Sequence, residues 1–193
     1  MDQPDFDSWV RRVFDGPEPS FFDLWDDDAD CEANWQLGHA TRLFRAPTFL
    51  LADFSPERLA AGLFKLPTSW QLTDLLWDAE QDWAAREACI NAMYILYRDL
   101  FTITALDGVA FMWWDLLRYS GQDADPRTAN AIVRVLEQVL ALPNGDCQWA
   151  ALHGLGHHGN GRRGAIIDTF LANTPVSDEL REYAVKAKAG DVL

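Results

Sequence analysis

The chain has 193 residues, of which 49% are hydrophobic and 24% are charged, and its formal net charge is −14. This length and composition exclude an intrinsically disordered protein and predict one folded domain over residues 1–193. The negative charge repels nucleic acid and anionic membrane, so we expect neither as a partner. Residues 1–32 carry −9 of this charge and the other 161 residues carry −5. We therefore divide the domain into an acidic N-terminal segment, 1–32, and a core of helical pairs, 33–193.

Neither a targeting signal nor a cysteine framework is visible. The start, MDQPDFDSWV, lacks the basic residues and apolar run of a signal peptide, and no stretch approaches the roughly 18 apolar residues that span a bilayer. Cys31, Cys89 and Cys147 are too scattered for a disulfide framework and are expected to be small buried residues. These features predict a cytoplasmic protein.

Apolar residues recur at helical spacing throughout the first half of the chain. Ser55 followed by Pro56 is a typical helix start, with a capping side chain and a proline in the first turn. The helices predicted in this half are 5–14, 34–44, 56–66, 69–77 and 83–101, the last being the longest.

The second half has clearer start and stop signals. Asp125-Pro126 predicts a helix start, Asp146 is the expected cap of the following helix, and Ser177 and Gly190 bracket the last one. The helices predicted here are 108–120, 126–142, 147–158, 164–172 and 178–189. The β-like run FTIT at 101–104 is too short to seed a sheet. The fold class is therefore all-α, either stacked antiparallel helix pairs or an irregular helical bundle.

The C-terminal fifty residues resemble a HEAT or armadillo-type helical repeat. The resemblance rests on an alanine-rich helix that ends in a turn, a second helix, and the start of a third. The matching residues are Leu155, Gly156, Gly159, Ile166, Ile167, Leu171, Leu180, Arg181 and Ala184. Leu152 and Leu180, taken as equivalent positions, are 28 residues apart, shorter than the usual period of about 40. The resemblance implies a short α-solenoid and no particular activity.

The segment AALHGLGHHGNGRRG, residues 150–164, contains the pattern GxGxxG twice. A dinucleotide site requires this pattern directly after a buried strand, because that geometry brings backbone amides to the pyrophosphate. Here the preceding residues are predicted to be helical. We therefore interpret the glycines as a helix end, with Gly154 and Gly156 allowing close approach of a neighbouring helix.

Three residues of the same helix, Trp149, His153 and His157, follow one another at intervals of four and share one ridge. The two histidines have the spacing of metal ligands, but position 154 is glycine, so the glutamate of the HExxH motif is missing. A third ligand would have to be His39 or a distant carboxylate. We expect no metal and no cofactor, and a structural role in which His157 or His158 interacts with the C-terminus of its own helix.

The chain has nine tryptophans, two of them in FMWWD at 111–115. Trp113 and its apolar neighbours lie on one helical face. Trp114 lies on a different face, near Arg118. Exposed aromatic residues are frequent anchors of protein interfaces. The predicted partner surface therefore comprises Asp26, Asp27, Asp28, Trp114, Trp149, His153 and His157.

These observations favour a non-enzymatic protein-binding module, an adaptor or an inhibitor of the immunity-protein type, that offers an acidic surface to a basic protein. No catalytic residue is assigned. Two enzymatic alternatives stay open. One is a HEAT-like DNA-base glycosylase using Trp113, Trp114, Asp115 and Arg118, and the other is a metal-dependent hydrolase built on His153 and His157. The sequence leaves the oligomeric state open.

Overall fold

A computed structural model describes residues 5–16, 29–104, 106, 108–119, 125–159 and 161–192, and for residues 29–33 the backbone alone. Within these ranges all regular structure is helical and there is no strand, which confirms the predicted all-α class. FTIT forms no strand, since Phe101 closes a π-helical turn. None of the helices in these ranges has the length and apolar character needed to cross a membrane.

Most of the helices that the structure describes are joined by short connections. In chain order they are α1 (Phe6–Phe14), α2 (Ala29–Arg45), the 3-10 turn η2 (Pro47–Phe49), α3 (Leu50–Asp53), α4 (Pro56–Lys65), α5 (Leu72–Trp77), α6 (Trp83–Leu96), the π-helical turn η3 (Tyr97–Phe101), α7 (Val109–Leu116), α8 (Pro126–Leu140), α9 (Gly145–His158), α10 (Arg163–Asn173) and α11 (Asp178–Ala189).

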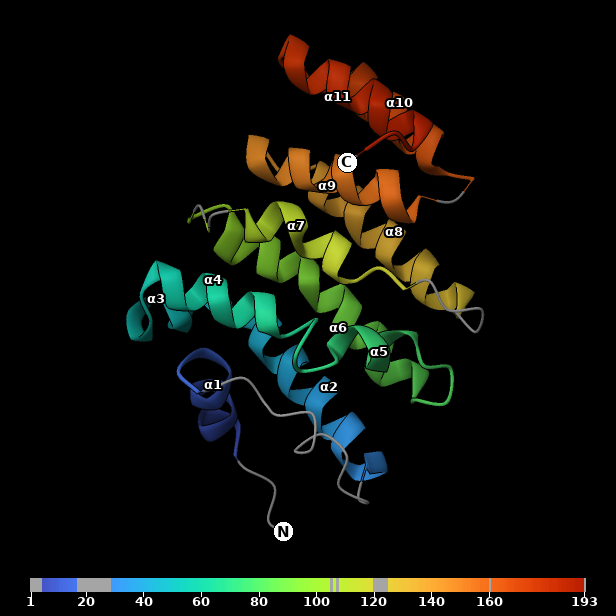
Figure 1. Cartoon of the computed structure of the whole chain (residues 1–193). Coiled ribbons are helices and arrows are strands. Elements are labelled where there is room, and N and C mark those ends of the chain that lie inside the picture. The colour runs from blue at the N-terminus through green and yellow to red at the C-terminus, as the bar shows by residue number, and fades with distance from the viewer. Residues whose placement is uncertain are drawn as a thin grey trace.

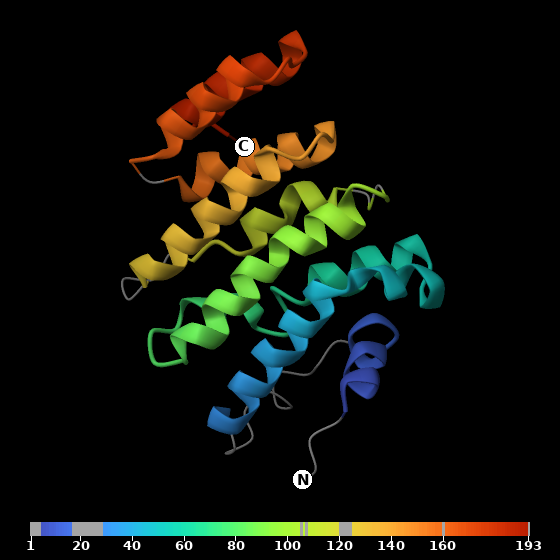
Figure 2. The ribbon, with the colours of Figure 1, turned by 180° about the vertical axis from the view of Figure 1, so that it is seen from behind.

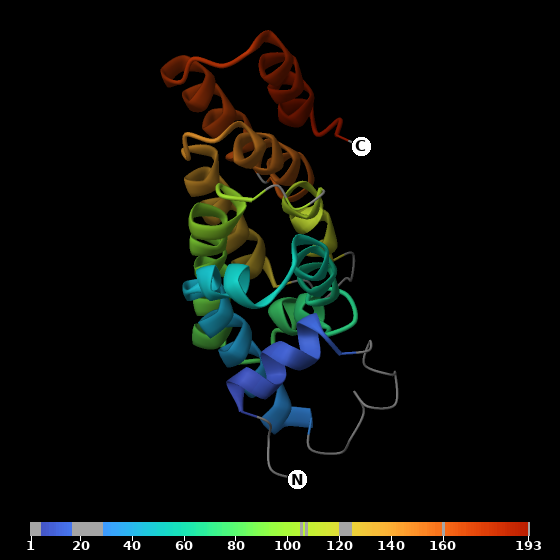
Figure 3. The ribbon, with the colours of Figure 1, turned by 90° about the vertical axis from the view of Figure 1, so that its left-hand side faces the viewer.

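The helices form two layers that run the length of the molecule (Figures 1 and 3). One layer contains α2, α6, α8 and α10, and it is the layer seen in front in Figure 2. The other contains α4, α7, α9 and α11, each in contact with the next. From α6 onward, successive helices alternate between the layers, so the chain builds a stack of helix pairs. This arrangement is compatible with a helical-repeat fold.

Helix starts that depend on local capping are confirmed. The side chains of Asp5, Ser55, Asp125 and Ser177 each accept a hydrogen bond from the first turn of the helix that follows. The last helix ends at Gly190, whose φ of 81° favours glycine. These signals need only neighbours in sequence, which is why the pattern predicted them correctly.

The cap predicted for α9 is wrong. Asn144, and not Asp146, caps this helix, because its side-chain oxygen accepts a hydrogen bond of 2.9 Å from the backbone N–H of Cys147. Asp146 lies in the first turn instead, where its charge suits the positive end of the helix dipole. Its carboxylate is consequently exposed and free to face another molecule.

Other helix ends differ from the prediction because tertiary contacts decide them. The helix predicted over 108–120 ends at Leu116, where Thr73 and Trp77 of α5 donate hydrogen bonds of 2.7 and 2.8 Å to the carbonyls of residues 116 and 117. Gly121, its predicted end, lies outside the described residues. The 83–101 helix turns π-helical after Leu96. Two helix starts also differ from the prediction. The helix α5 begins at residue 72, after Gln71 in a left-handed conformation. The helix α2 begins at residue 29, so the predicted boundary between the acidic segment 1–32 and the core lies inside α2.

The glycines of the GxGxxG pattern pack closely against neighbouring helices. A Cβ atom on Gly154 would lie 2.5 Å from Leu136 of α8 and 2.7 Å from Trp114 of α7, and one on Gly156 would collide with Val192. Substitution would therefore push α9 away from its neighbours. This confirms the interpretation that the two glycines permit close approach.

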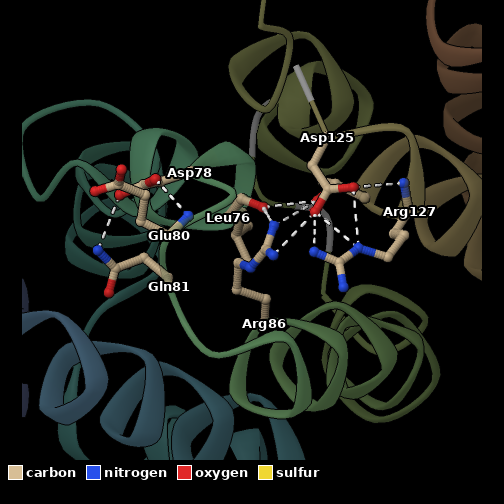
Figure 4. A network of polar contacts seen from close by, with 8 residues as sticks. Leu76, Asp78, Glu80, Gln81, Arg86, Asp125 and Arg127 are labelled. Carbon is tan, nitrogen blue, oxygen red and sulfur yellow. Dashed lines mark hydrogen bonds and ion pairs between the residues drawn. The ribbon is translucent and has the colours of Figure 1, made fainter. Parts of the chain in front are cut away.

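A buried ion pair joins α5, α6 and α8 (Figure 4). Arg86 of α6 is fully buried and donates a hydrogen bond of 2.9 Å to Asp125, the cap of α8. The same guanidinium reaches the Leu76 carbonyl and the Thr128 hydroxyl, both at 3.3 Å. Asp125 also pairs with the exposed Arg127 at 2.8 Å. One side chain thus anchors three helices of the stack.

This network predicts a loss of stability in acid. Hydrogen bonds from Arg127, aided by Arg86, lower the pKa of Asp125 from 3.8 to about 2. A carboxylate whose pKa is lower in the folded than in the unfolded state stabilises the fold. This stabilisation is complete at a pH above the unfolded-state pKa, and it is lost as the pH falls through the folded-state pKa. We expect the contribution, on the order of 2 kcal/mol, to vanish between pH 4 and pH 2. Urea unfolding of the wild type and Asp125→Asn across this range measures it, and a constant difference between the two proteins would contradict the prediction.

Candidate functional site

Three consecutive helices of one layer, α7, α9 and α11, bring together the polar groups of the candidate site. Asp115 is the last residue but one of α7. His153 and His157 lie one turn apart near the end of α9, facing α7. Tyr183 reaches His153 from α11. Because α9 lies between the other two helices, its histidine ridge is covered from both sides.

The side chains form a continuous polar chain. The Tyr183 hydroxyl lies 2.6 Å from His153 Nδ1, and His153 Nε2 lies 2.7 Å from Asp115 Oδ2. The other carboxylate oxygen, Oδ1, lies 2.8 Å from His157 Nε2. Asp115, His153 and His157 each offer one possible ligand atom, an oxygen or a nitrogen. These three atoms lie within 4.8 Å of one another. The set therefore contains two imidazoles on either side of one carboxylate, close enough together to be candidate ligands of one ion.

Burial and hydrogen bonding are unequal across this set. The His153 side chain is fully buried, whereas those of His157 and Asp115 are 12% and 18% exposed. Although Asp115 Oδ1 and His157 Nε2 are close, they lack the alignment of a hydrogen bond, and both are buried polar atoms without a hydrogen-bond partner. Such atoms are uncommon in folded proteins because each carries an uncompensated desolvation cost. The site therefore has unused hydrogen-bonding capacity at these two buried atoms.

The surroundings favour neutral side chains. Burial lowers the pKa of His157, and His153 and Arg118 act in the same direction against the attraction of Asp115. Burial, followed by the nearby charge of Asp115, raises the pKa of Tyr183 to about 12. The surroundings therefore disfavour the charged forms of the Tyr183 phenol and of His157. Neutral imidazole is the form that can donate an electron pair to a metal.

A pocket of about 400 Å³ adjoins this cluster. Phe111 forms part of its wall and stacks on His153, with 4.1 Å between ring centroids. Trp149 forms another part and contacts the Tyr183 ring at 4.5 Å. Phe101 and Leu106 are buried, and the exposed Asp146 also lines the pocket. Among the described residues that line it, the pocket thus combines aromatic walls with one carboxylate.

The structure brings only part of the predicted surface together. Trp149, His153 and His157 share one ridge, as the helical projection predicted, but this ridge is not free: α7 and α11 cover it and His153 is completely buried. Trp114 is also completely buried and stacks on Tyr97, so its side chain is not on the surface. Trp113 is buried as well, so neither ring can stack on a DNA base. Asp26, Asp27 and Asp28 lie outside the described residues.

Several contacts of the site had no signal in the sequence. Asp115 supplies the distant carboxylate that a metal site at the two histidines would need as its third ligand, but it lies 38 residues from His153 in the sequence. His158 was expected to interact with the C-terminus of its own helix, but its Nε2 lies 2.6 Å from the Trp114 carbonyl of the neighbouring α7. Tyr183 was predicted as an apolar contact of the last helix. Only the stacking of α7, α9 and α11 reveals its polar role.

The fold and the site define an all-α protein with stacked helix pairs and a two-histidine, one-carboxylate cluster between them. No family model, curated protein or solved structure gives a significant match to the chain. The function is therefore argued from the geometry of these residues.

Proposed function

We propose that this protein is a non-enzymatic, HEAT-like binding module, an adaptor or an immunity-type inhibitor, that recognises a basic protein. The pocket between α7 and α9 is the place where an arginine or lysine side chain of the partner inserts. The observation that carries the proposal is the composition of this pocket, in which the aromatic rings of Phe111 and Trp149 occur together with the carboxylate of Asp146.

This composition suits a long cationic side chain. The apolar stem of lysine or arginine packs on aromatic surface, while its charged end gains from the ring face and from a carboxylate. Among the described residues that line the pocket there is no lysine or arginine to compete for Asp146. Pockets of a few hundred cubic ångströms that combine aromatic walls with few polar groups are typical ligand sites.

The charge of the whole chain supports the same kind of partner. A net charge of −14 attracts a basic protein over distances comparable with the Debye length and raises the rate of encounter. Most of this charge lies in residues 1–32, and reversing Asp26, Asp27 and Asp28 together is expected to weaken capture and its dependence on salt. Stacked helix pairs also provide the extended surface that repeat proteins use for binding.

The test is capture of a basic partner from a lysate of the source organism, followed by measurement of its affinity. Asp146→Lys is expected to weaken binding at least tenfold, on the order of 1.4 kcal/mol, because it replaces the attractive charge with a repulsive one. Trp149→Ala is expected to weaken it as well, because the pocket loses an aromatic wall. Isothermal titration calorimetry of the identified partner measures both effects.

Asp178→Lys is the matched control. Asp178 is also an exposed acid in the first turn of a helix, so this variant changes the net charge and the helix dipole in the same way without touching the pocket. Equal losses in Asp146→Lys and Asp178→Lys would show that only net charge matters. Capture that none of these variants changes would refute the proposal.

A further inference from the structure

We infer that Asp115, His153 and His157 bind one divalent transition-metal ion of the zinc or ferrous type. This inference is independent of the proposed function, since none of these three residues lines the adjoining pocket. It rests on three observations: the convergence of three ligand atoms, the unpartnered polar atoms among them, and a second group that orients the buried histidine.

The first observation is the ligand set and its geometry. Two imidazoles at i and i+4 of a helix and a carboxylate from a facing helix form an N₂O set that suits zinc and ferrous ions. Metal–ligand bonds of about 2.0–2.2 Å place tetrahedral ligand atoms about 3.3 Å apart. The present separations of 2.7 Å and 2.8 Å are shorter than this and involve different oxygens of Asp115, one facing each histidine. The set as a whole lies within 4.8 Å, so binding one ion requires side-chain shifts on the order of an ångström that open the Asp115 contacts and bring the three ligand atoms around one point.

The second observation is the unused bonding capacity of the site. Asp115 Oδ1 and His157 Nε2 are buried, lie 2.8 Å apart and make no hydrogen bond, although their side chains are 18% and 12% exposed. A cation between them compensates the desolvation of both atoms at once. With three protein ligands, the remaining coordination positions are available to water or to a small ligand, as in sites that are not purely structural.

The third observation is the orientation of His153. Its Nδ1 lies 2.6 Å from the Tyr183 hydroxyl, and metal-bound histidines almost always have such a partner on the second nitrogen. Neutral His153 binds a metal through Nε2 once its proton resides on Nδ1, from which it donates to the Tyr183 oxygen. This changes the tautomer and the direction of one hydrogen bond, and it leaves the net charge of the imidazole unchanged.

The experiment uses the full chain, untagged and stripped with a chelator. Calorimetric titration with Zn²⁺ at neutral pH is expected to give one ion per chain, and Co²⁺ is expected to give visible ligand-field absorption typical of bound cobalt. Tyr183→Phe is expected to lower the zinc affinity about 10–100-fold, and His157→Gln and Asp115→Asn to lower it further, with loss of the cobalt spectrum.

His39→Gln is the control, because it makes the same change in the aromatic cluster of Phe6, Trp9 and Trp35, away from the site. It is expected to keep the affinity of the wild type. His157→Gln is the variant most certain to fold, since His157 Nε2 has no hydrogen bond to lose, and circular dichroism verifies its helix content. Absence of saturable Zn²⁺ binding by the wild type, or equal affinity in His157→Gln, would overturn the inference.

Discussion

Arg86→Ala is expected to lower the free energy of unfolding by about 3–5 kcal/mol, which is the usual cost of removing one partner of a buried ion pair. The guanidinium is fully buried, and its loss leaves the Leu76 carbonyl and the Thr128 hydroxyl without this donor. It also leaves the nearly buried Asp125 with only Arg127, whose side chain is 53% exposed. Denaturant unfolding followed by circular dichroism measures the loss.

Arg127→Ala is the matched control for this prediction. Arg127 contacts the same carboxylate, but water screens its charge, so its removal is expected to cost about 0–1 kcal/mol. The backbone N–H of residue 127 still donates to Asp125 in this variant, so the cap of α8 remains. If Arg86→Ala and Arg127→Ala destabilise the protein equally, burial is not what gives Arg86 its role.

Trp114→Ala is expected to destabilise the protein by about 3–5 kcal/mol, because it deletes a large aromatic side chain from the core. Trp114 is fully buried, stacks on Tyr97 at 5.4 Å with an angle of 10° between the rings, and packs directly over Gly154 of α9. Its removal leaves a cavity where α7, α9 and η3 meet. Thermal and urea unfolding of the variant provide the measurement.

Trp149→Ala separates packing from recognition. Trp149 is only partly buried and lines the pocket. Trp149→Ala is therefore expected to destabilise the fold less than Trp114→Ala does. It is also expected to weaken partner binding more than the conservative core variant Trp114→Phe does. A Trp114→Ala protein within 1 kcal/mol of the wild type would contradict the core assignment.

The sequence was sufficient at several helix starts where the governing contact is local, although it misplaced the cap of α9. Ser55 with Pro56, Asp125 with Pro126, and Ser177 each begin a helix, because a side-chain oxygen needs only an N–H two or three residues ahead. The all-α class likewise follows from apolar spacing within single helices. The sequence failed at the end of α7, where the hydrogen bonds that stop the helix come from residues 73 and 77.

What the sequence determined by itself is therefore the longer helices, the acidic charge and the common ridge of Trp149, His153 and His157; it missed η2 and α3. Only the tertiary structure decided the surroundings of that ridge. A single-helix projection shows which residues share a face, but it cannot show what covers the face. The stacking of α7 and α11 on α9 buries His153 and places Asp115 and Tyr183 beside it. These residues are 30 or more positions apart in the sequence, and the packing of the helices brings them into contact. Helix packing leaves no local pattern in the sequence from which these contacts could be predicted.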